Sequence, residues 1–418
     1  MTAAPMQPVY RRIAWRLVPF LVLLYTVAVL DRVNISFAAL TMNRDLGISD
    51  RMYGFAAGVF FLSYCLFQVP ANILLARIGA RRWLGLLMIV WGMVSMATAF
   101  VPNTAAYIGL RAALGIAESG FYPGVIYYFT FWLPRSQRTR VLALFLLAFP
   151  LSNIVGSPIS AHILLMDQFA GMRGWQWVFL LEGVPAVLLG FVTWWVLADG
   201  PLSAAWLSPS ERETVARDLS QDEAVHRTGS NSGWLKVIGD ALAYFMWSSG
   251  VYGLSFFLPK ILVARGASPL STGWWATLTF TTGAIAMYWA SHRRGYRLLP
   301  VLIFAAGVGF AAAGYFHSVT GAVASFCLAA MGLLSALPIF WSAATGRLSG
   351  KAAGAAIAFV NSVGAVGAFA GPYAMGWLHD STHSYVAGLW SIAACLGAGA
   401  LLTVNAATDA ARPAVTTT

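Results

Sequence analysis

Four ionisable residues stand inside or at the ends of long apolar stretches: Asp31, Arg32, Arg111 and Glu118. Ionisable groups are costly in such surroundings and commonly mark a substrate or ion pathway. Guanidinium groups bind carboxylates through two hydrogen bonds and keep their charge at any relevant pH. A carboxyl group removed from water can take up and release a proton near neutral pH. Together these residue types predict a site that binds an organic anion and couples its binding to protons.

The spacing of these residues indicates how helices would present them. Arg111 and Glu118 are seven positions apart, so they share one face of a helix, and Gly115 between them is expected to leave open space. Tyr64 and Gln68, four positions apart, form a second polar stripe. An alternative is that the charges are static ion pairs, Arg111 with Glu118 or Asp31 with Arg32, that lock helices together.

Aromatic residues are expected to shape the pocket around these charges, although each of them alone is more often a packing residue. Those considered are Tyr64, Phe121, Tyr122, Tyr252 and Trp341. Glu182, beside Gly183 and Pro185, is interpreted as a structural or interfacial group.

The elements that carry these residues follow from the composition. Of the 418 residues, 59% are hydrophobic and only 10% are charged, and the mean hydropathy is +0.71. Soluble domains have about 25% charged residues, so an ordinary water-soluble fold is excluded. Since a membrane-spanning helix needs about 20 apolar residues, twelve spans are predicted. They are 13–33, 53–75, 83–101, 104–132, 141–164, 176–197, 236–258, 271–290, 298–317, 320–344, 353–376 and 385–405.

One long polar stretch divides these spans six and six. We therefore expect an all-α membrane protein of two six-helix bundles, with residues 1–197 as the first half, 198–235 as a cytoplasmic linker and 236–418 as the second half. Within the linker, the residues from Ser208 to Glu213 predict a short capped helix.

The net charge of +11 reports membrane topology rather than nucleic-acid binding. With a cytoplasmic N-terminus, nineteen of the 26 basic residues fall on the cytoplasmic side, five fall outside, and Arg32 and Arg111 remain within the spans. Cytoplasmic loops are enriched in Lys and Arg, so both termini are predicted to be cytoplasmic. The first apolar segment runs directly into Asp31 without a small-residue cleavage site, so we expect a retained helix.

Other chemistries lack support in the sequence. Cys65, Cys327 and Cys395 lie in apolar runs without paired spacing and are interpreted as small core residues. His379 and His383 are four apart, but further metal ligands are not evident. We expect no metal, no cofactor and no enzymatic activity.

Several motifs resemble those of the major facilitator superfamily, and the likeness covers nearly the whole chain. Residues 76–82 (ARIGARR) resemble its signature between the second and third helices, with a weaker echo at 291–297 (SHRRGYR). More specific are the segments 31–38, 111–124, 174–183 and 361–372, which resemble the anion:cation symporter family and its tartrate- and phthalate-transporter-like branch.

The resemblance implies roles for individual residues. Asp31 and Glu118 match acids that take part in proton coupling in the related galactonate transporters. Arg32 and Arg111 match the arginines that follow the first of these acids and precede the second by two turns, with Arg111 expected near the substrate carboxylate. Tyr64 matches a pocket tyrosine, and Asn361 matches a substrate-binding asparagine. The substrate-binding residues expected are Arg32, Tyr64, Gln68, Arg111, Tyr122, Tyr252, Trp341 and Asn361.

The chain also departs from the usual patterns of the superfamily and of that branch. Ala76 stands where the superfamily usually has Asp, a replacement that is common in this branch, and His292 replaces the acid of the second echo. Gln68 stands where tartrate-like relatives often have Glu, so one candidate protonatable group is absent. These departures bear on the substrate more than on the family.

The expected function is proton-coupled import of a small organic anion through the inner (plasma) membrane by alternating access. The substrate would be a hydroxy dicarboxylate such as tartrate, a sugar acid or an aromatic acid. The partners are this carboxylate, protons and the lipid bilayer, without nucleic acid, and the protein is expected to act as a monomer. The alternatives are an exchanger or exporter of the same fold and, from another class, a membrane enzyme or sensor.

Overall fold

The computed structural model describes residues 8–225, 234–292, 297–347 and 351–409, and within these ranges every regular element is a helix. The first α-helices are α1 (Pro8–Val33), α2 (Ile35–Asp45), α3 (Asp50–Ile78), α4 (Ala80–Ala97), α5 (Thr104–Glu118), α6 (Phe121–Thr130), α7 (Arg135–Leu146), α8 (Ala148–Ile163) and α9 (Gly174–Val196). They are followed by α10 (Pro209–Val225), α11 (Trp234–Ala264), α12 (Pro269–His292), α13 (Leu298–Tyr315), α14 (Val319–Arg347), α15 (Lys351–Thr382) and α16 (Tyr385–Asp409). Short 3₁₀ turns are η1 (Thr98–Phe100), η2 (Leu164–Met166), η3 (Phe169–Gly171) and η4 (Pro201–Ser203).

Ten helical stretches of the described residues are long and apolar enough to cross a membrane. Two predicted spans are not among them. The segment 104–132 was predicted as one span, but the chain turns at Ser119 and Gly120. This turn divides the segment into α5, of 15 residues, and α6, of 10. The segment 271–290 lies in α12, which has 24 residues, but its Thr, Trp and Gly residues lower its hydropathy. Length and burial position, rather than hydropathy, make α12 part of the bundle.

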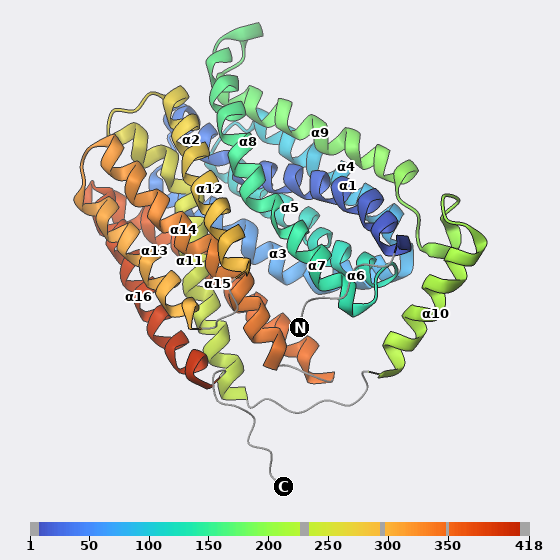
Figure 1. Ribbon diagram of the computed structural model, residues 1–418. Helices are drawn as coiled ribbons and strands as arrows, with labels where there is room; N and C mark the ends of the chain where they lie inside the picture. The colour runs from blue at the N-terminus through green and yellow to red at the C-terminus, as the bar shows by residue number, and fades with distance from the viewer. Residues whose placement is uncertain (1–7, 226–233, 293–296, 348–350, 410–418) are drawn as a thin grey trace.

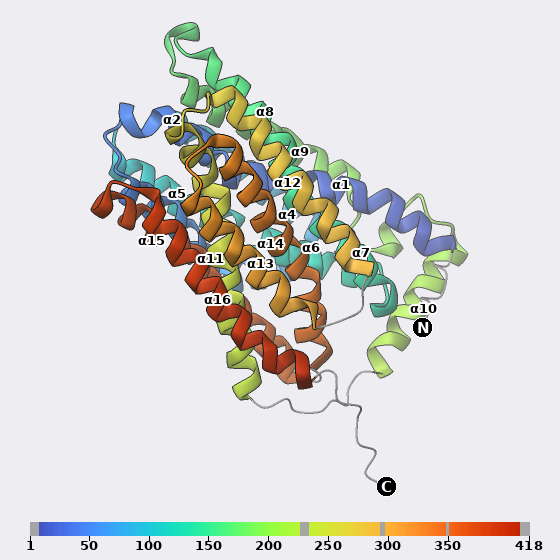
Figure 2. The same ribbon diagram turned by 60° about the vertical axis from the view of Figure 1, so that its left-hand side comes forward.

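The helices before the linker lie on one side of the molecule and those after it on the other (Figures 1 and 2). The most extensive contacts between the sides are those of α3 along α15 and of α8 along α12, and α2 also packs against α11. Each side also has its own tight pairs, α4 with α9 in the first and α11 with α15 in the second. The site described below lies between these groups of helices.

Glycines allow the backbones to touch where α3 meets α15. A Cβ atom on Gly54 would collide with the Pro372 carbonyl, and one on Gly376 would collide with the Asp50 carbonyl. Within the second group, Gly367 and Gly371 similarly press against the backbone of α11. Small residues are the usual means of close helix approach in membranes, so this seam between the two groups is closed by backbone contact.

The linker helix α10 lies outside the bundle, at the right of Figure 1. Its predicted cap is confirmed: the Ser208 backbone N–H donates to Glu211 over 2.9 Å, and the Glu211 N–H donates to the Ser208 hydroxyl over 3.3 Å. The Ser208 amide holds the pKa of the Glu211 carboxyl below its usual value. Tyr10 donates to Asp218 over 2.8 Å, so α10 is fastened to the beginning of α1.

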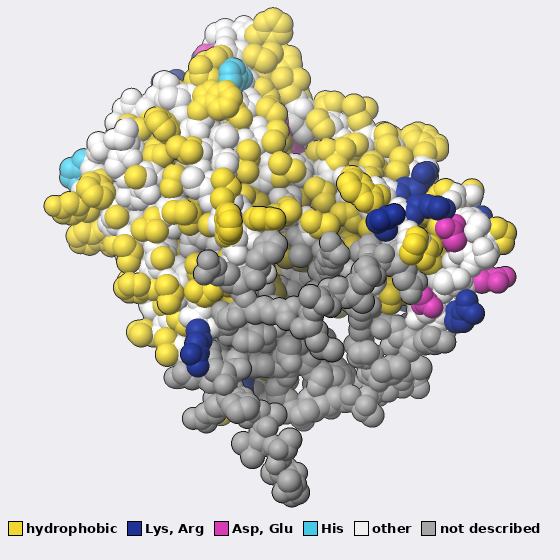
Figure 3. Space-filling model, in the orientation of Figure 1, with side chains coloured by type: hydrophobic (Ala, Val, Ile, Leu, Met, Phe, Trp, Pro, Cys, Tyr) yellow, Lys and Arg dark blue, Asp and Glu magenta, His cyan; other side chains and the backbone are white. Residues whose placement is uncertain are grey.

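The surface is apolar over the helical bundle and charged beside α10 (Figure 3). Large hydrophobic side chains such as Trp195, at 77% exposed, and Val301, at 60%, face outward from the spans. Exposed apolar surface of this extent is expected where lipid, rather than water, is the solvent.

Candidate functional site

The four charged residues singled out in the sequence form one buried group, here called the central charge cluster: Asp31, Arg32, Arg111 and Glu118. Their exposed fractions are 1%, 6%, 1% and 1%. Arg32 and Asp31 lie at the end of α1, whereas Arg111 and Glu118 lie two turns apart on α5. The structure therefore brings these four residues together, and their roles in binding and proton coupling stay predictions.

The pairing inside the central charge cluster differs from both ion pairs that the sequence left open as an alternative. Arg32 Nη2 donates to Glu118 Oε2 over 2.8 Å, so Glu118 pairs with α1 and not with Arg111. Asp31 Oδ1 accepts from the Ser95 hydroxyl over 3.0 Å and is not paired with Arg32. The physical reason is direction: successive residues of a helix point about 100° apart, so Asp31 faces α4 while Arg32 faces α5.

Several polar atoms of the central charge cluster are unsatisfied. Asp31 Oδ2, Glu118 Oε1 and Arg111 Nε have no hydrogen-bond partner among the described residues. Arg111 Nη2 reaches only the Arg32 carbonyl, at 3.4 Å. Most buried polar groups in proteins are hydrogen-bonded, so these atoms leave capacity for water, protons or a carboxylate.

Phe60 of α3 is a site residue that the sequence did not reveal. The Arg32 guanidinium carbon lies 4.9 Å from the centre of its ring, and that of Arg111 lies 5.2 Å from it. Phe60 is four residues before Tyr64, whose ring centre is 5.5 Å from the Arg32 guanidinium. This i, i+4 spacing was the available signal, and the shared ring helps to hold two positive charges near each other.

The expected space at Gly115 does not exist. A Cβ atom there would collide with the Phe60 carbonyl and the Ser63 hydroxyl of α3. The glycine instead allows α3 and α5 to approach, which brings Phe60 to the two arginines. The glycine prediction was wrong about space but does concern the positioning of the site.

Tyrosines from both groups of helices gather beside the central charge cluster. Tyr122 of α6 lies within electrostatic range of Tyr64 of α3 and of Tyr252 and Tyr244 of α11. Tyr25, with its ring centre 5.4 Å from that of Tyr122, completes this group. The sequence predicted Tyr64, Tyr122 and Tyr252, and missed Tyr25 and Tyr244. Their spacings, seven residues before Arg32 and eight before Tyr252, place them on the same helical faces.

The remaining predicted residues are placed less directly. The Trp341 ring of α14 lies 5.1 Å from that of Tyr244, within the aromatic group, and Phe121 packs 4.9 Å from Trp91. Gln68 on α3 and Asn361 on α15 are half-buried. The three cysteines are half-buried and free. Residues 293–296 of the second signature echo lie outside the described residues.

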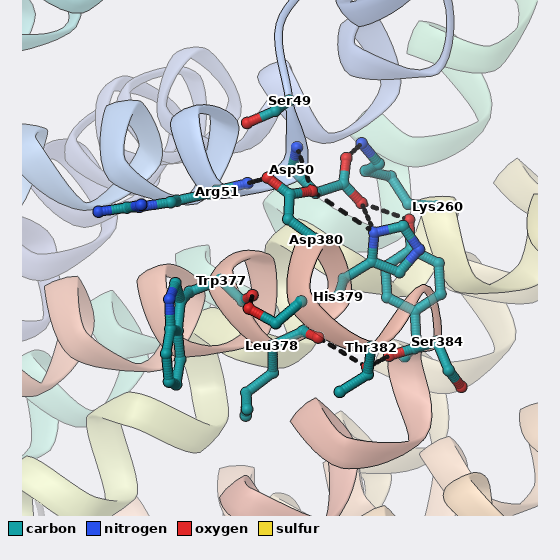
Figure 4. A network of polar contacts seen from close by, with 12 residues as sticks. Ser49, Asp50, Arg51, Lys260, Trp377, Leu378, His379, Asp380, Thr382 and Ser384 are labelled. Carbon is teal, nitrogen blue, oxygen red and sulfur yellow. Dashed lines mark hydrogen bonds and ion pairs between the residues drawn. The ribbon is translucent and has the colours of Figure 1, made fainter.

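A second polar group lies where α3 begins (Figure 4). We call it the Asp50 network: Asp50, Lys260, His379, Asp380 and Tyr385. The Asp50 carboxylate pairs with Lys260 of α11, accepts from the Tyr385 hydroxyl of α16 over 2.6 Å, and lies 3.1 Å from His379 Nδ1 of α15. One carboxylate from the first group of helices is thus held by three helices of the second.

The contacts of Asp380 strengthen this junction. Its two carboxylate oxygens accept from the backbone N–H groups of Asp50, over 3.1 Å, and Arg51, over 2.9 Å. Unpaired N–H groups at a helix start favour a carboxylate, so Asp380 of α15 caps α3. In the sequence, Lys260 and Arg51 looked like ordinary loop charges. Each partner, Asp50 for Lys260 and Asp380 for the Arg51 backbone, is too far away in the sequence to give a recognisable spacing.

The loop between α3 and α4 carries the proposed signature motif. Gly79 has φ of 90°, which favours glycine, and Arg81 N–H donates to Asp199 over 3.2 Å. This loop is tied to the segment just after α9 and faces the α10 side of the molecule.

A family model described as Major Facilitator Superfamily matches residues 21–372. The chain belongs to the Major Facilitator Superfamily.

Relatives of this superfamily member extend over almost its whole length. It is 43% identical over 408 residues to a protein of Agrobacterium vitis named "Putative tartrate transporter", covering 95% of this chain and 90% of the relative. It is 34% identical to an Acinetobacter baumannii protein named "Quinolone resistance transporter", covering 94% of each chain. This superfamily member is therefore a multi-pass membrane transporter and not an enzyme.

A solved structure confirms the fold. The xylose transporter XylE of E. coli, in a partially occluded inward-open conformation, matches with a TM-score of 0.76 and 13% identity, covering 94% of this chain and 97% of that one. At this identity the likeness concerns the fold alone. The major facilitator fold predicted from the sequence is thus confirmed.

Proposed function

We propose that this transporter imports a small organic anion together with protons, and that the central charge cluster is its binding and coupling site. The observation that carries the proposal is a buried set of two arginines and two carboxyl groups with atoms left unsatisfied. The substrate class is a small carboxylate, first a hydroxy dicarboxylate such as tartrate, then a sugar acid or an aromatic acid. The name of the Agrobacterium vitis relative supports this order.

The charges of the central cluster provide a coupling mechanism. When Asp31 and Glu118 are protonated, the two arginines carry uncompensated positive charge and attract an anion. When both carboxyl groups are ionised, they compensate Arg32 and Arg111 and compete with the substrate for the guanidinium groups. Protonation therefore changes the affinity for the anion, which is the differential interaction that coupled transport requires.

Alternating access would use the two groups of helices as moving units, with residues 1–197 and 236–418 joined by the linker 198–235. The distribution of basic residues supports placing both termini and α10 in the cytoplasm, and the Asp50 network on the extracellular side of the inner membrane. Because the seam at the Asp50 network is closed, the anion would leave this state toward the cytoplasm. The aromatic group and Trp341, Gln68 and Asn361 would then face the substrate.

Ligand binding tests the substrate class. We expect tartrate to raise the melting temperature of the purified protein in detergent, and Arg111→Ala to remove this shift while the unliganded protein keeps its melting temperature within a few degrees. Arg111→Lys keeps the charge but loses the two-pronged geometry and should bind weakly. An unchanged shift in Arg111→Ala would contradict the carboxylate-binding role.

Transport in liposomes tests the coupling. Glu118→Gln should lose accumulation driven by a pH gradient and retain counterflow, because exchange of loaded substrate needs no net proton movement. Retained proton-driven accumulation would exclude Glu118 as an essential coupling acid.

Export is the second candidate, since the Acinetobacter baumannii relative is named for quinolone resistance. A pH gradient that expels the substrate from inside-out vesicles, with no anion accumulation in right-side-out vesicles, would favour it over import.

A further inference from the structure

A small polar chamber lies between the central charge cluster and the Asp50 network. Its space for the centre of a water molecule is about 10 Å³, enough for roughly one water. Its polar wall consists of Asn34, Ser36, Asn153, Ser157, Ser160 and Ser255. This is an unusual concentration of amides and hydroxyls for the middle of a bundle of apolar helices, because buried polar groups are costly without partners.

Two side chains of the chamber have unused hydrogen-bonding capacity. Both amide atoms of Asn34, which is 2% exposed, and the Ser255 hydroxyl, which is 3% exposed, have no hydrogen-bond partner in the described part of the chain. Asn34 belongs to the junction of α1 and α2, and Ser255 belongs to α11. A water in this space would bridge the two groups of helices.

Glu182 of α9 lies directly behind this wall. Ser160 donates to Glu182 Oε1 over 2.5 Å, while Oε2 has no partner among the described residues. The Asn34 amide interacts with the same carboxyl group at longer range than a hydrogen bond. Glu182 is only 3% exposed, so of the two expectations from the sequence, a structural or an interfacial group, burial favours the structural one.

In the described part of the chain, Glu182 has an acidic neighbour but no basic group that interacts with it. From α1, Asp31 lies within electrostatic range. On α2, the Asp45 carboxylate already interacts with Arg173 and the Trp175 indole. On α4, the polar groups near Asp31 are Ser95 and Trp91, which carry no charge. On α8, His162 is exposed and hydrogen-bonds to the Pro158 carbonyl. A buried carboxyl without a cationic partner avoids ionisation by holding a proton.

Resting on the proposed proton-coupled function, we propose that Glu182 is a proton relay that receives protons from the extracellular side through the chamber and passes them to Asp31. The proton moves from water to a carboxylate oxygen of Glu182. It then passes to a carboxylate oxygen of Asp31, which lies within electrostatic range, once movement of the helices brings the two groups within hydrogen-bond distance. Glu182 is left as a carboxylate, and the next proton from the chamber neutralises it. Asn34 follows Asp31 by about one helical turn, lines the chamber and interacts with the Glu182 carboxyl group, so it lies near both proton transfers.

The composition of the chamber wall links this relay to alternating access. The wall joins α1, α2 and α8 of the first group with α11 and α12 of the second. The Thr277 hydroxyl of α12 donates to the Ile154 carbonyl of α8 over 3.0 Å, and this hydrogen bond joins two of the helices that line the chamber. Separation of the two groups at the Asp50 end would open the chamber to the outside, whereas their contact isolates Glu182 with Asp31. Proton exchange with the outside is thereby confined to one state.

Transport by purified protein in liposomes tests the relay, with Glu182→Gln as a variant of matching shape and Glu213→Gln, on the exposed face of α10, as the matched control. Positioned proton donors contribute roughly 10²–10⁴-fold, so we expect uptake driven by a pH gradient to fall about tenfold or more in Glu182→Gln. Its increase with external acidity should flatten, and counterflow should persist. Glu213→Gln should match the wild type.

The outcomes separate the relay from the proposed function. Wild-type transport without proton movement, followed with an internal pH dye, would overturn both. Coupled wild-type transport with an unchanged rate and pH profile in Glu182→Gln would overturn the relay alone, as would loss of both uptake and counterflow, which indicates a structural role.

A labelling experiment on the wild-type protein avoids any folding defect of the variant. Dicyclohexylcarbodiimide reacts with protonated carboxyl groups in apolar surroundings. We expect mass spectrometry to locate its adduct on Glu182, with less adduct as pH rises. Absence of an adduct on Glu182 at acidic pH would overturn the relay.

Discussion

The central charge cluster and the Asp50 network both hold carboxylates beside basic groups in the interior, but they satisfy them differently. In the central charge cluster, one oxygen each of Asp31 and Glu118 has no hydrogen-bond partner among the residues that the structure describes. In the Asp50 network, both carboxylate oxygens of Asp50 and both of Asp380 are engaged. The first cluster lies within the helices that precede the linker, whereas the second joins those helices to the ones that follow it.

This difference indicates different work. Unsatisfied buried groups are costly in a finished structure, yet they are what a site needs to hold a ligand or proton for part of a cycle. Fully paired charges stabilise one arrangement and must all separate when it opens. These observations support the proposal that the central charge cluster serves binding and that the Asp50 network holds the seam between the two groups of helices closed.

The largest effect that tests this comparison is expected at Arg32. Arg32→Gln leaves Glu118 buried without its guanidinium partner, and breaking a buried pair costs about 3–5 kcal/mol. We expect a large fall in the melting temperature together with loss of transport.

The double variant Arg32→Gln with Glu118→Gln is the control for this prediction. It should recover much of the stability, because no lone buried charge remains, but not the transport. A single variant as stable as the wild type would show that Arg32 is not the main partner of Glu118.

The next effect is expected at Asp50. Asp50→Asn keeps the shape of the side chain but weakens its contacts with Lys260 and Tyr385, which favours opening of the extracellular seam. A loss of about 1 kcal/mol corresponds to roughly fivefold in population. We expect a Ser255→Cys reporter, in a chain whose three native cysteines are replaced by serine, to react several-fold faster with a membrane-impermeant maleimide.

Lys260→Met is the matched partner for this test. Since it removes the other half of the same contact, it should increase labelling similarly, and the double variant should add little to either single change. Slower labelling in Asp50→Asn would contradict a closing role for the network.

The sequence predicted one of these two regions much better than the other. Charge inside an apolar run is informative at a single position, so Asp31, Arg32, Arg111 and Glu118 could be identified without a structure. The Arg32–Glu118 pair could not, because 86 positions separate the two residues and each had a nearer candidate partner. Asp50, Lys260 and His379 were missed because each lies at a span end, where charges are ordinary.

The fold was predictable to the same degree. Hydropathy located most spans, since lipid imposes length and composition on each helix separately. Hydropathy failed at residues 104–132, where a local turn at Ser119 and Gly120 divides the helix. The spacing argument failed at Gly115, because its close neighbour is the backbone of another span. Features that depend on one segment were predictable, and those that depend on two were not.

The smallest effect is expected at the rim of the Asp50 network, where Arg51 Nε donates to the Tyr373 hydroxyl over 3.3 Å. Both groups are solvent-accessible, and the contact is a single long hydrogen bond, so we expect it to contribute about 0.4 kcal/mol, within the lower half of the range for exposed contacts to charged groups. Tyr373→Phe removes the hydroxyl but keeps the ring that stacks on Phe369. Maleimide labelling of the Ser255→Cys reporter should therefore stay within about twofold of the unmodified background, since 0.4 kcal/mol is about a factor of two. Labelling as fast as in Asp50→Asn would mean that contacts at the exposed rim hold the seam as strongly as Asp50 does. The contrast between the fully paired Asp50 network and the partly unpaired central charge cluster would then no longer depend on Asp50.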